Sequence, residues 1–136
     1  MRDILRLQKE DIDIGSVLKE TRSDNDGAQI VFVGCVRDDG LDGLEIEAFV
    51  PVAETDLRKI ADEAEAIPGV SSVHIIHRYG RLRVGETIVV TVVCSAHRGE
   101  GYEASRLIIE RIKEYVPIWK QEITKCGNKG KWVEKH

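Results

Sequence analysis

The fold prediction starts from the segment SAHRGEGYEASRLIIERIKEYVPIWK, residues 95–120. Its pattern indicates where a strand ends and where a helix begins and ends. The run before it, Thr87–Cys94, is apolar and rich in β-branched residues, which is typical of a strand. Within the segment, apolar side chains recur at spacings of three and four: Ala104, Leu107, Ile108, Ile112, Tyr115 and Val116. This period predicts a helix over residues 101–116. Pro117 cannot continue the helix and must follow its end.

Candidate functional residues lie at both ends of this helix. His97 and Arg98 occupy the junction between strand and helix, a place where a rigid scaffold often presents functional side chains. A histidine there can act as an acid or base, and an arginine can hold a phosphate through two parallel hydrogen bonds. The alternative is that both are ordinary surface residues.

Lys113 falls in the last turn of the predicted helix and Lys120 lies just beyond it. Two lysines in one pocket repel each other, and repulsion combined with partial burial lowers the pKa of a lysine. Such a lysine can serve as nucleophile or general base near neutral pH, while its charged neighbour binds an anion. The alternative is that Lys113 only complements the dipole at the helix C-terminus.

The charge distribution supports an anion partner near the C-terminus. Residues 111–135 carry seven lysines or arginines against three acids, although the whole chain has a net charge of −4. A cationic end on an acidic protein indicates a local anionic ligand and argues against a nucleic-acid groove. Lysines of this region that are simply solvated would give the same count.

Length and composition predict one soluble domain spanning residues 1–136. The hydrophobic fraction of 42% and the charged fraction of 32% are typical of a globular protein. No apolar run approaches the roughly 20 residues of a membrane helix, and the N-terminus has no signal-peptide core. We therefore expect a cytoplasmic protein that binds neither membrane nor nucleic acid.

The cysteines and histidines give no metal or disulfide signature. Cys35, Cys94 and Cys126 form no CxxC pair. The first two fall in strand-like runs, where we expect burial, and Cys126 falls in a lysine-rich loop, where we expect exposure. His74 and His77 are three residues apart in a predicted strand, so they point to opposite faces and do not form a metal-binding pair. We predict no metal and no cofactor.

The remaining pattern predicts an α+β fold with mostly antiparallel strands. We expect helices at 12–21, 51–67 and 101–116, and strands at 4–7, 28–36, 44–50, 70–79, 86–94, 118–124 and 131–133. Residues 28–36 read as a buried strand because of their β-branched content. Residues 80–85 are predicted to be a hairpin-like connection, and 128–130 a tight turn.

Six motifs in this order resemble the MoaE family, the large catalytic subunit of molybdopterin synthase. They are FVGCVR (32–37), IIHRYGRLRVGE (75–86), VVCSAHR (92–98), YEASRLIIERIK (102–113), PIWKQE (117–122) and WVE (132–134). The resemblance covers about residues 28–135. The succession of SAHR, a helix, PIWK and WVE is its most specific part.

The resemblance implies an α/β-hammerhead subunit that forms a homodimer within a heterotetramer. The second component is a small ubiquitin-like sulfur carrier whose C-terminal Gly-Gly tail bears a thiocarboxylate. The enzyme of this family is a sulfurtransferase that transfers two sulfurs to cyclic pyranopterin monophosphate and so forms the dithiolene of molybdopterin. Because the carrier supplies the sulfur, none of the cysteines of this chain need be catalytic, and the transfer needs no metal.

The resemblance also assigns site residues. Lys113 and Lys120 match the two lysines assigned to catalysis. The positions that match substrate-binding residues are Cys35, Val36, Arg37, His97, Arg98, Lys113, Lys120, Gln121 and Glu122. Chemically this set suits its ligands, because a pterin phosphate and a C-terminal acyl group are both anionic.

The chain departs from the family pattern at several positions that affect partner fit and substrate contacts. Ala48-Phe49 replaces a frequent His-Tyr pair, and Cys35 replaces a frequent lysine. Lys135 stands where arginine is common, and the loop after Arg37 is shorter. Neither the downstream metal, molybdenum or tungsten, nor the order of the two sulfur transfers can be inferred from the residues.

Two other functions remain open from the residues alone. A non-catalytic anion-binding or regulatory module could use the same scaffold, but it would not need both lysines. A phosphate-ester hydrolase could use His97 as acid or base, but the chain offers no clear nucleophile or metal site for it.

Overall fold

The computed structural model describes residues 3–133 and contains three helices and eight strands within that range. The helices are α1 (Ile14–Thr21), α2 (Val50–Glu65) and α3 (Arg98–Tyr115). The strands are β1 (Leu5–Gln8), β2 (Ala28–Cys35), β3 (Gly43–Ala48), β4 (Val70–Arg78), β5 (Gly80–Arg83), β6 (Thr87–Ser95), β7 (Ile118–Ile123) and β8 (Lys129–Trp132). Glu134 and Lys135, which belong to the charge count and the motif comparison above, lie outside the described residues.

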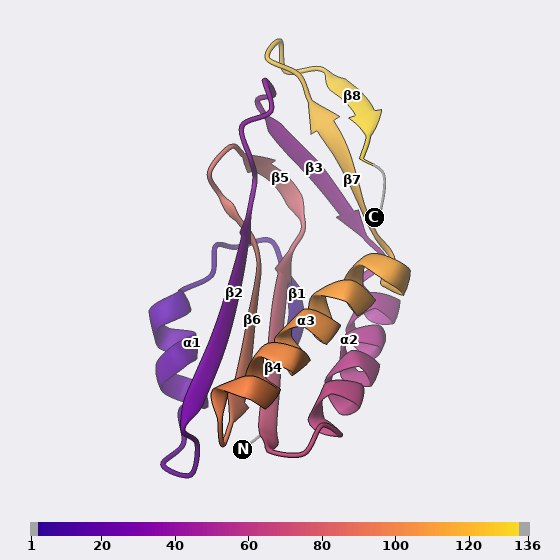
Figure 1. The fold of residues 1–136 in the computed structure, drawn as a ribbon. Helices are drawn as coiled ribbons and strands as arrows, with labels where there is room; N and C mark the ends of the chain where they lie inside the picture. The colour runs from indigo at the N-terminus through magenta and orange to yellow at the C-terminus, as the bar shows by residue number, and fades with distance from the viewer. Residues whose placement is uncertain (1–2, 134–136) are drawn as a thin grey trace.

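The strands form two four-stranded sheets (Figure 1). Sheet A has the order β1-β4-β6-β2, and sheet B has the order β5-β3-β7-β8. β1 pairs with β4 in parallel, and the other pairs are antiparallel. Helices α2 and α3 cover one face of sheet A and α1 covers the other, while sheet B extends beyond the helices. The predicted α+β architecture with mostly antiparallel strands is confirmed.

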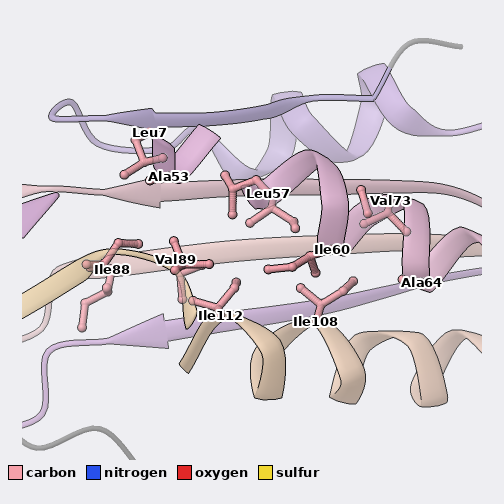
Figure 2. Close-up of a cluster of buried hydrophobic side chains, with 14 of the residues drawn as sticks. Leu7, Ala53, Leu57, Ile60, Ala64, Val73, Ile88, Val89, Ile108 and Ile112 are labelled. Carbon is pink, nitrogen blue, oxygen red and sulfur yellow. The ribbon is translucent and has the colours of Figure 1, made fainter. Parts of the chain in front are cut away.

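The central strand β6 has buried side chains on both faces of sheet A. Val89 and Val93 pack toward α2 and α3, whereas Val90, Val92 and Cys94 belong to the cluster under α1. Burial on both faces explains why this strand reads as a continuous apolar run rather than as an alternating one. Figure 2 shows the larger cluster, in which apolar side chains of the two helices pack over the sheet: Leu57, Ile60, Ile108 and Ile112 against Val73 and Val89.

Local capping explains where the helices begin. The side chain of Asp13 accepts a hydrogen bond from the backbone N–H of Ser16 and caps α1. At α3, the backbone N–H of His97 donates to the Glu100 carboxylate at 3.0 Å in a capping box. This box starts α3 at Arg98, three residues before the predicted position. The helix ends at Tyr115, just before Pro117, as predicted.

Residues 28–36 were predicted to form a buried strand. The strand exists as β2, but the prediction that it is buried is wrong. β2 is the edge strand of sheet A, and the side chains of Val31, Phe32 and Val33 are exposed. Cys35, predicted to be buried, is exposed as well. An apolar, β-branched run has the same composition whether its strand lies at the centre or at the edge of a sheet, so hydropathy could not distinguish the two. The burial of Cys94 and the exposure of Cys126 are confirmed.

Two turns in sheet B differ from the prediction. Residues 80–83, expected in a connection, form strand β5, which pairs with β3 from Gly43↔Arg83 to Ile46↔Gly80. The tight turn predicted at 128–130 lies earlier, where Gly127 adopts φ of +82° and its N–H donates to the Thr124 carbonyl. Only glycine adopts such a positive φ without strain, so Gly127 sets the position of the turn.

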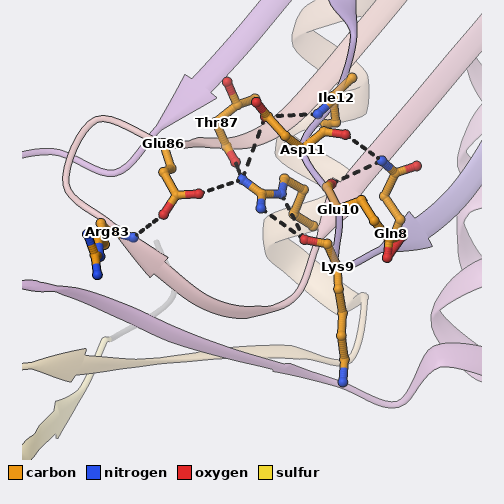
Figure 3. A network of polar contacts seen from close by, with 9 residues as sticks. Gln8, Lys9, Glu10, Asp11, Ile12, Arg83, Glu86 and Thr87 are labelled. Atoms are coloured by element: carbon orange, nitrogen blue, oxygen red, sulfur yellow. Dashed lines mark hydrogen bonds and ion pairs between the residues drawn. The ribbon is translucent and has the colours of Figure 1, made fainter.

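A buried guanidinium holds the place where the chain passes from sheet A to sheet B. Arg78 ends β4 and is almost fully buried. Its Nε and Nη2 donate to the Lys9 carbonyl, at 3.2 and 2.9 Å. Its Nη1 donates to the Thr87 carbonyl at 3.1 Å and forms an ion pair with Glu86 at 3.2 Å (Figure 3). One side chain therefore ties the end of β1 and the start of β6 to β4. Arg78 is satisfied by its neighbours, as predicted for a residue of the sheet.

We predict that Arg78→Met lowers the free energy of unfolding by about 3 kcal/mol, because it leaves buried carbonyls and a carboxylate without their donor. Urea denaturation followed by circular dichroism measures this change. Arg106→Met is the matched control, since the Arg106 side chain is 83% exposed and forms a solvent-exposed ion pair with Glu110. Equal denaturation midpoints for the two variants would contradict the structural role of Arg78.

Candidate functional site

A cavity of about 790 Å³ lies where the two sheets and the end of α3 meet. Its volume is in the range of small-molecule sites. The end of β2 and the loop after it contribute Phe32, Cys35, Arg37, Asp39 and Leu41. Sheet B, α3 and β6 contribute Leu44, Lys120, Glu122, Lys113 and Ile88, and the last described residues contribute Lys131, Trp132 and Val133.

The two predicted catalytic lysines reach this cavity from different elements. Lys113 lies in the last turn of α3. Lys120 is directly opposite Ile46 in the β3–β7 ladder, so both side chains point to the same face of sheet B. Ile46 is buried in the core, which identifies that face as the inner one. Lys120 therefore points inward, toward sheet A, and lines the cavity together with Lys113.

The electrostatic balance of the cavity is positive. Arg37, Lys113, Lys120 and Lys131 line it, against Asp39 and Glu122. Arg37 and Asp39 form an ion pair at 2.9 Å, but both side chains are largely exposed to solvent, where such a pair contributes little. The arrangement can bind an anion and can supply or accept a proton next to it.

Five of the nine predicted substrate-binding residues line the cavity: Cys35, Arg37, Lys113, Lys120 and Glu122. Val36 does not, because its side chain is buried in the core. Gln121 points to the opposite face of sheet B from Lys120, and its side chain donates to the Gly130 carbonyl at 3.0 Å. Neither residue therefore lines the cavity.

His97 and Arg98 lie away from this cavity within the same chain. They stand at the N-terminal end of α3, whereas Lys113 lies in its last turn. Lys113 lies fifteen positions after Arg98 in α3, which is roughly 22 Å along the helix axis. Both side chains at this end are exposed, and the His97 ring lies 3.5 Å from the Glu100 carboxylate. A single chain therefore does not bring His97 and Arg98 together with Lys113 and Lys120.

The sequence interpretation missed the aromatic lining of the cavity. Phe32 and Trp132 both line it and are partly exposed. Phe32 was assigned to a buried strand, and Trp132 was used only as part of a motif. The available signal was the position of Trp132 in a short polar strand, where an aromatic side chain has no core to enter.

A buried imidazole lies close enough to the cavity to sense Lys120. His77 faces the core side of β4 and is only 3% exposed. Its Nδ1–H donates to the Arg78 carbonyl at 2.8 Å, which fixes the tautomer. The pKa of His77 is lowered to about 4, chiefly by burial; the Arg78 hydrogen bond opposes the shift and the positive charge of Lys120 contributes to it.

His74, on the other face of β4, is also held by neighbours. Its Nδ1 accepts a hydrogen bond from the Ile4 N–H, and its Nε2 contacts the Ser72 hydroxyl. The prediction that His74 and His77 are satisfied within the sheet is confirmed. Between residues 3 and 133, no three His, Cys, Asp or Glu side chains are grouped in a way that could hold a metal ion. In the same range, no helix is long and apolar enough to span a membrane.

Fold and cavity together define a class: an α+β domain with a cationic small-molecule cavity between two sheets. The family model described as MoaE protein matches residues 7–115. The chain belongs to the MoaE family.

Named relatives agree with this assignment. The molybdopterin synthase catalytic subunit of Mesorhizobium japonicum is 36% identical over 135 residues, covering 96% of this chain and 84% of the relative. The X-ray structure of molybdopterin synthase from Staphylococcus aureus superposes with a TM-score of 0.87 at 37% identity, covering 98% of both chains. A complex of subunits 1 and 2 of molybdopterin-converting factor from Helicobacter pylori gives a TM-score of 0.81 at 26% identity, covering 97% of this chain and 91% of that one.

We predict that His77 makes the protein less stable in acid. The pKa of His77 is about 4 in the folded chain and about 6.5 when unfolded, so the unfolded chain binds more protons between these values. Stability from this group is therefore complete above pH 6.5 and is lost as the pH falls toward 4, by up to about 3 kcal/mol. The measurement is the free energy of unfolding as a function of pH.

His77→Asn is the matched variant, because its amide can still donate to the Arg78 carbonyl but cannot titrate. Burial, followed by the neighbouring Asp3, raises the pKa of Glu65 to about 7, which gives the opposite slope in the same pH window. The contribution of His77 is therefore the difference between the wild-type and His77→Asn curves. Parallel curves from pH 7 to pH 4 would refute the prediction.

Proposed function

We propose that this chain is the catalytic subunit of a molybdopterin synthase. In this role it transfers sulfur from the thiocarboxylated C-terminus of a small carrier subunit to cyclic pyranopterin monophosphate, in the biosynthesis of the molybdenum cofactor. The observation that carries the proposal is the convergence of Lys113, Lys120 and Arg37 on one cavity. The names of the relatives, and the two-subunit complex from Helicobacter pylori, support the same role and the same kind of partner.

The chemistry assigns a part to each cation. The carrier thiocarboxylate sulfur forms a bond to a carbon of the pterin side chain while the C–O bond at that carbon breaks and its oxygen leaves with the phosphate or as water. Water then hydrolyses the acyl C–S bond, which releases the carrier as a carboxylate and leaves the sulfur on the pterin. Lys113 and Lys120 hold the anionic groups and move protons at the reacting atoms. Arg37 binds an anionic group at the rim of the cavity. The inserted Gly-Gly tail reaches the lysines without any cysteine of this chain taking part.

We place the reaction in the cytoplasm. Cys35, Cys94 and Cys126 are free thiols, and two of them are exposed. Exposed free thiols suit a reducing compartment.

We assign His97 and Arg98 to the same site through a homodimer. Ala28 pairs with Ser95 and Cys35 with Thr87, so β2 runs from the His97 end of sheet A to the cavity end. β2 is also the apolar edge of sheet A, with Val31 and Val33 exposed. Antiparallel pairing of two β2 strands about a two-fold axis places the His97 end of one copy beside the cavity end of the other. Each site then combines the lysines of one chain with His97 and Arg98 of its partner.

We expect Lys113→Ala and Lys120→Ala each to lower the rate of dithiolene formation at least about 100-fold, which is the usual loss when a proton-transfer group is removed. The assay mixes purified protein, thiocarboxylated small subunit and cyclic pyranopterin monophosphate. Lys125→Ala is the matched control, because Lys125 is exposed and does not line the cavity. A lysine variant with wild-type turnover would remove that lysine from the mechanism. Absence of product from wild-type protein that binds a thiocarboxylated carrier would favour a non-catalytic anion-binding module.

Complementation between inactive variants tests the shared site. His97→Ala/Arg98→Ala protein and Lys113→Ala/Lys120→Ala protein should each be inactive alone. Mixed dimers, isolated by two different affinity tags, contain one intact site of two and should recover about half of the wild-type rate. Inactive mixed dimers would show that the residues of each site come from one chain, or that His97 and Arg98 act elsewhere.

A further inference from the structure

One guanidinium on α2 holds three carboxylates, and one of these belongs to the segment just before β1. Nη2 of Arg58 donates to the Asp3 carboxylate at 2.8 Å and to the Glu65 carboxylate at 2.8 Å. Its Nε donates to the Asp62 carboxylate at 3.0 Å. The Asp62 side chain is 66% exposed, whereas Glu65 is 26% exposed and Asp3 only 6%. Two of the three acidic groups are therefore shielded from water.

The geometry of this cluster brings two like charges together. Asp3 and Glu65 accept from the same nitrogen atom, so their two oxygens lie within twice 2.8 Å of each other. One cation cannot neutralise both carboxylates, and two carboxylates this close ionise together only at a cost. Burial, followed by the hydrogen bond and the charge of Asp3, raises the pKa of Glu65 to about 7, while Arg58 opposes the shift. A proton shared between the two carboxyl groups removes the repulsion.

The residue next to the cluster carries the first pairing bonds of β1. The Ile4 N–H donates to Nδ1 of the buried His74 at 3.0 Å, and the Ile4 carbonyl accepts from the Ile75 N–H at 2.8 Å. His74 is the titratable group that β4 presents to this segment. Burial lowers the pKa of His74, so its ring stays neutral and its Nδ1 remains an acceptor at neutral pH and above. In that range the cluster around Arg58 is the part of this attachment that changes its charge.

We propose that a proton shared by Asp3 and Glu65 holds the first residues of β1 against α2, and that loss of this proton loosens this end of the strand. The pKa of Glu65 lies above its ordinary value of 4.5, so the folded segment binds the proton more tightly than the opened one. The attachment is therefore strongest below about pH 4.5 and weakens as the pH rises through about 7. This inference does not depend on the cavity or on the proposed function.

The test measures amide hydrogen exchange of the full-length protein by NMR, with each rate divided by the rate of an unstructured peptide at the same pH. Between about pH 6 and about pH 8.5, the protection of the Ile4 and Ile75 amides should fall about tenfold, because the folded segment loses the proton over this range. At each pH these amides should exchange faster than the amide of Val92, which lies in the central strand β6. Faster exchange identifies a local opening.

Neutral variants of the acidic residues separate the shared proton from other effects of pH. Glu65→Gln can still donate a hydrogen bond to Asp3 but cannot ionise, so its Ile4 protection should not vary with pH. Glu63→Gln is the matched control, because Glu63 lies on the same helix but pairs with Arg111, and it should keep the wild-type tenfold change. The chemical shift of the Glu65 carboxyl carbon should titrate with a midpoint of about 7 in the wild type and a lower midpoint in Asp3→Asn.

Three results would overturn the inference. A Glu65 carboxyl that titrates near its ordinary value of 4.5 would exclude the shared proton. A midpoint near 7 with Ile4 protection that does not change with pH would show that the proton does not hold the strand. Equal exchange of Ile4 and Val92 would show that the segment opens only when the whole protein unfolds. If Glu65→Gln does not fold, as seen by circular dichroism, the wild-type and Asp3→Asn proteins decide by the same criteria.

Discussion

The guanidinium of Arg78 is the interaction on which the relative placement of the two sheets depends. β4 ends at Arg78 in sheet A, and β5 begins at Gly80 in sheet B. Gly80 adopts φ of +100°, which allows the chain to change direction there. Arg78 fixes this turn because its donors bind carbonyls at the end of β1 and at the start of β6. The cavity lies between the two sheets, so its shape depends on the buried Arg78 guanidinium. This side chain lies on the face of β4 opposite His77.

Helices could be predicted well, because they follow from a periodic pattern within one segment. The pairing of strands from different segments could not be predicted. The spacing of Ala104, Ile108 and Ile112 defined α3 to within three residues, because helix amphipathicity is recorded locally. The exposure of β2 was missed, since edge position depends on which strand lies beside it and not on its own composition. Strand β5 was missed for a related reason, because its partner β3 is distant in sequence. The glycines at 80 and 85, at its start and just after its end, are typical of a connecting loop.

The candidate site shows the same division. Lys113 and Lys120 were predicted together and line the same cavity, because a helix end and the strand that follows it are neighbours in the chain. His97 and Arg98 were predicted from the same helix, but the length of α3 separates them from the lysines. Trp132 joins the site only through the β7–β8 ladder, a contact that the order of residues does not reveal.

The open edge of β2 leaves the chain exposed to unwanted strand pairing. The strand Ala28–Cys35 contains no charged residue and no proline, the devices by which natural sheet edges usually resist unwanted pairing. Before a correct partner covers it, the same edge can template disordered aggregation of newly synthesised chains. In the proposed homodimer, assembly and misassembly would compete for this one strand, and dimer formation would stabilise the folded state by mass action. An expression host that makes the chain rapidly would be expected to accumulate aggregates, because the exposed β2 edge is then at high concentration.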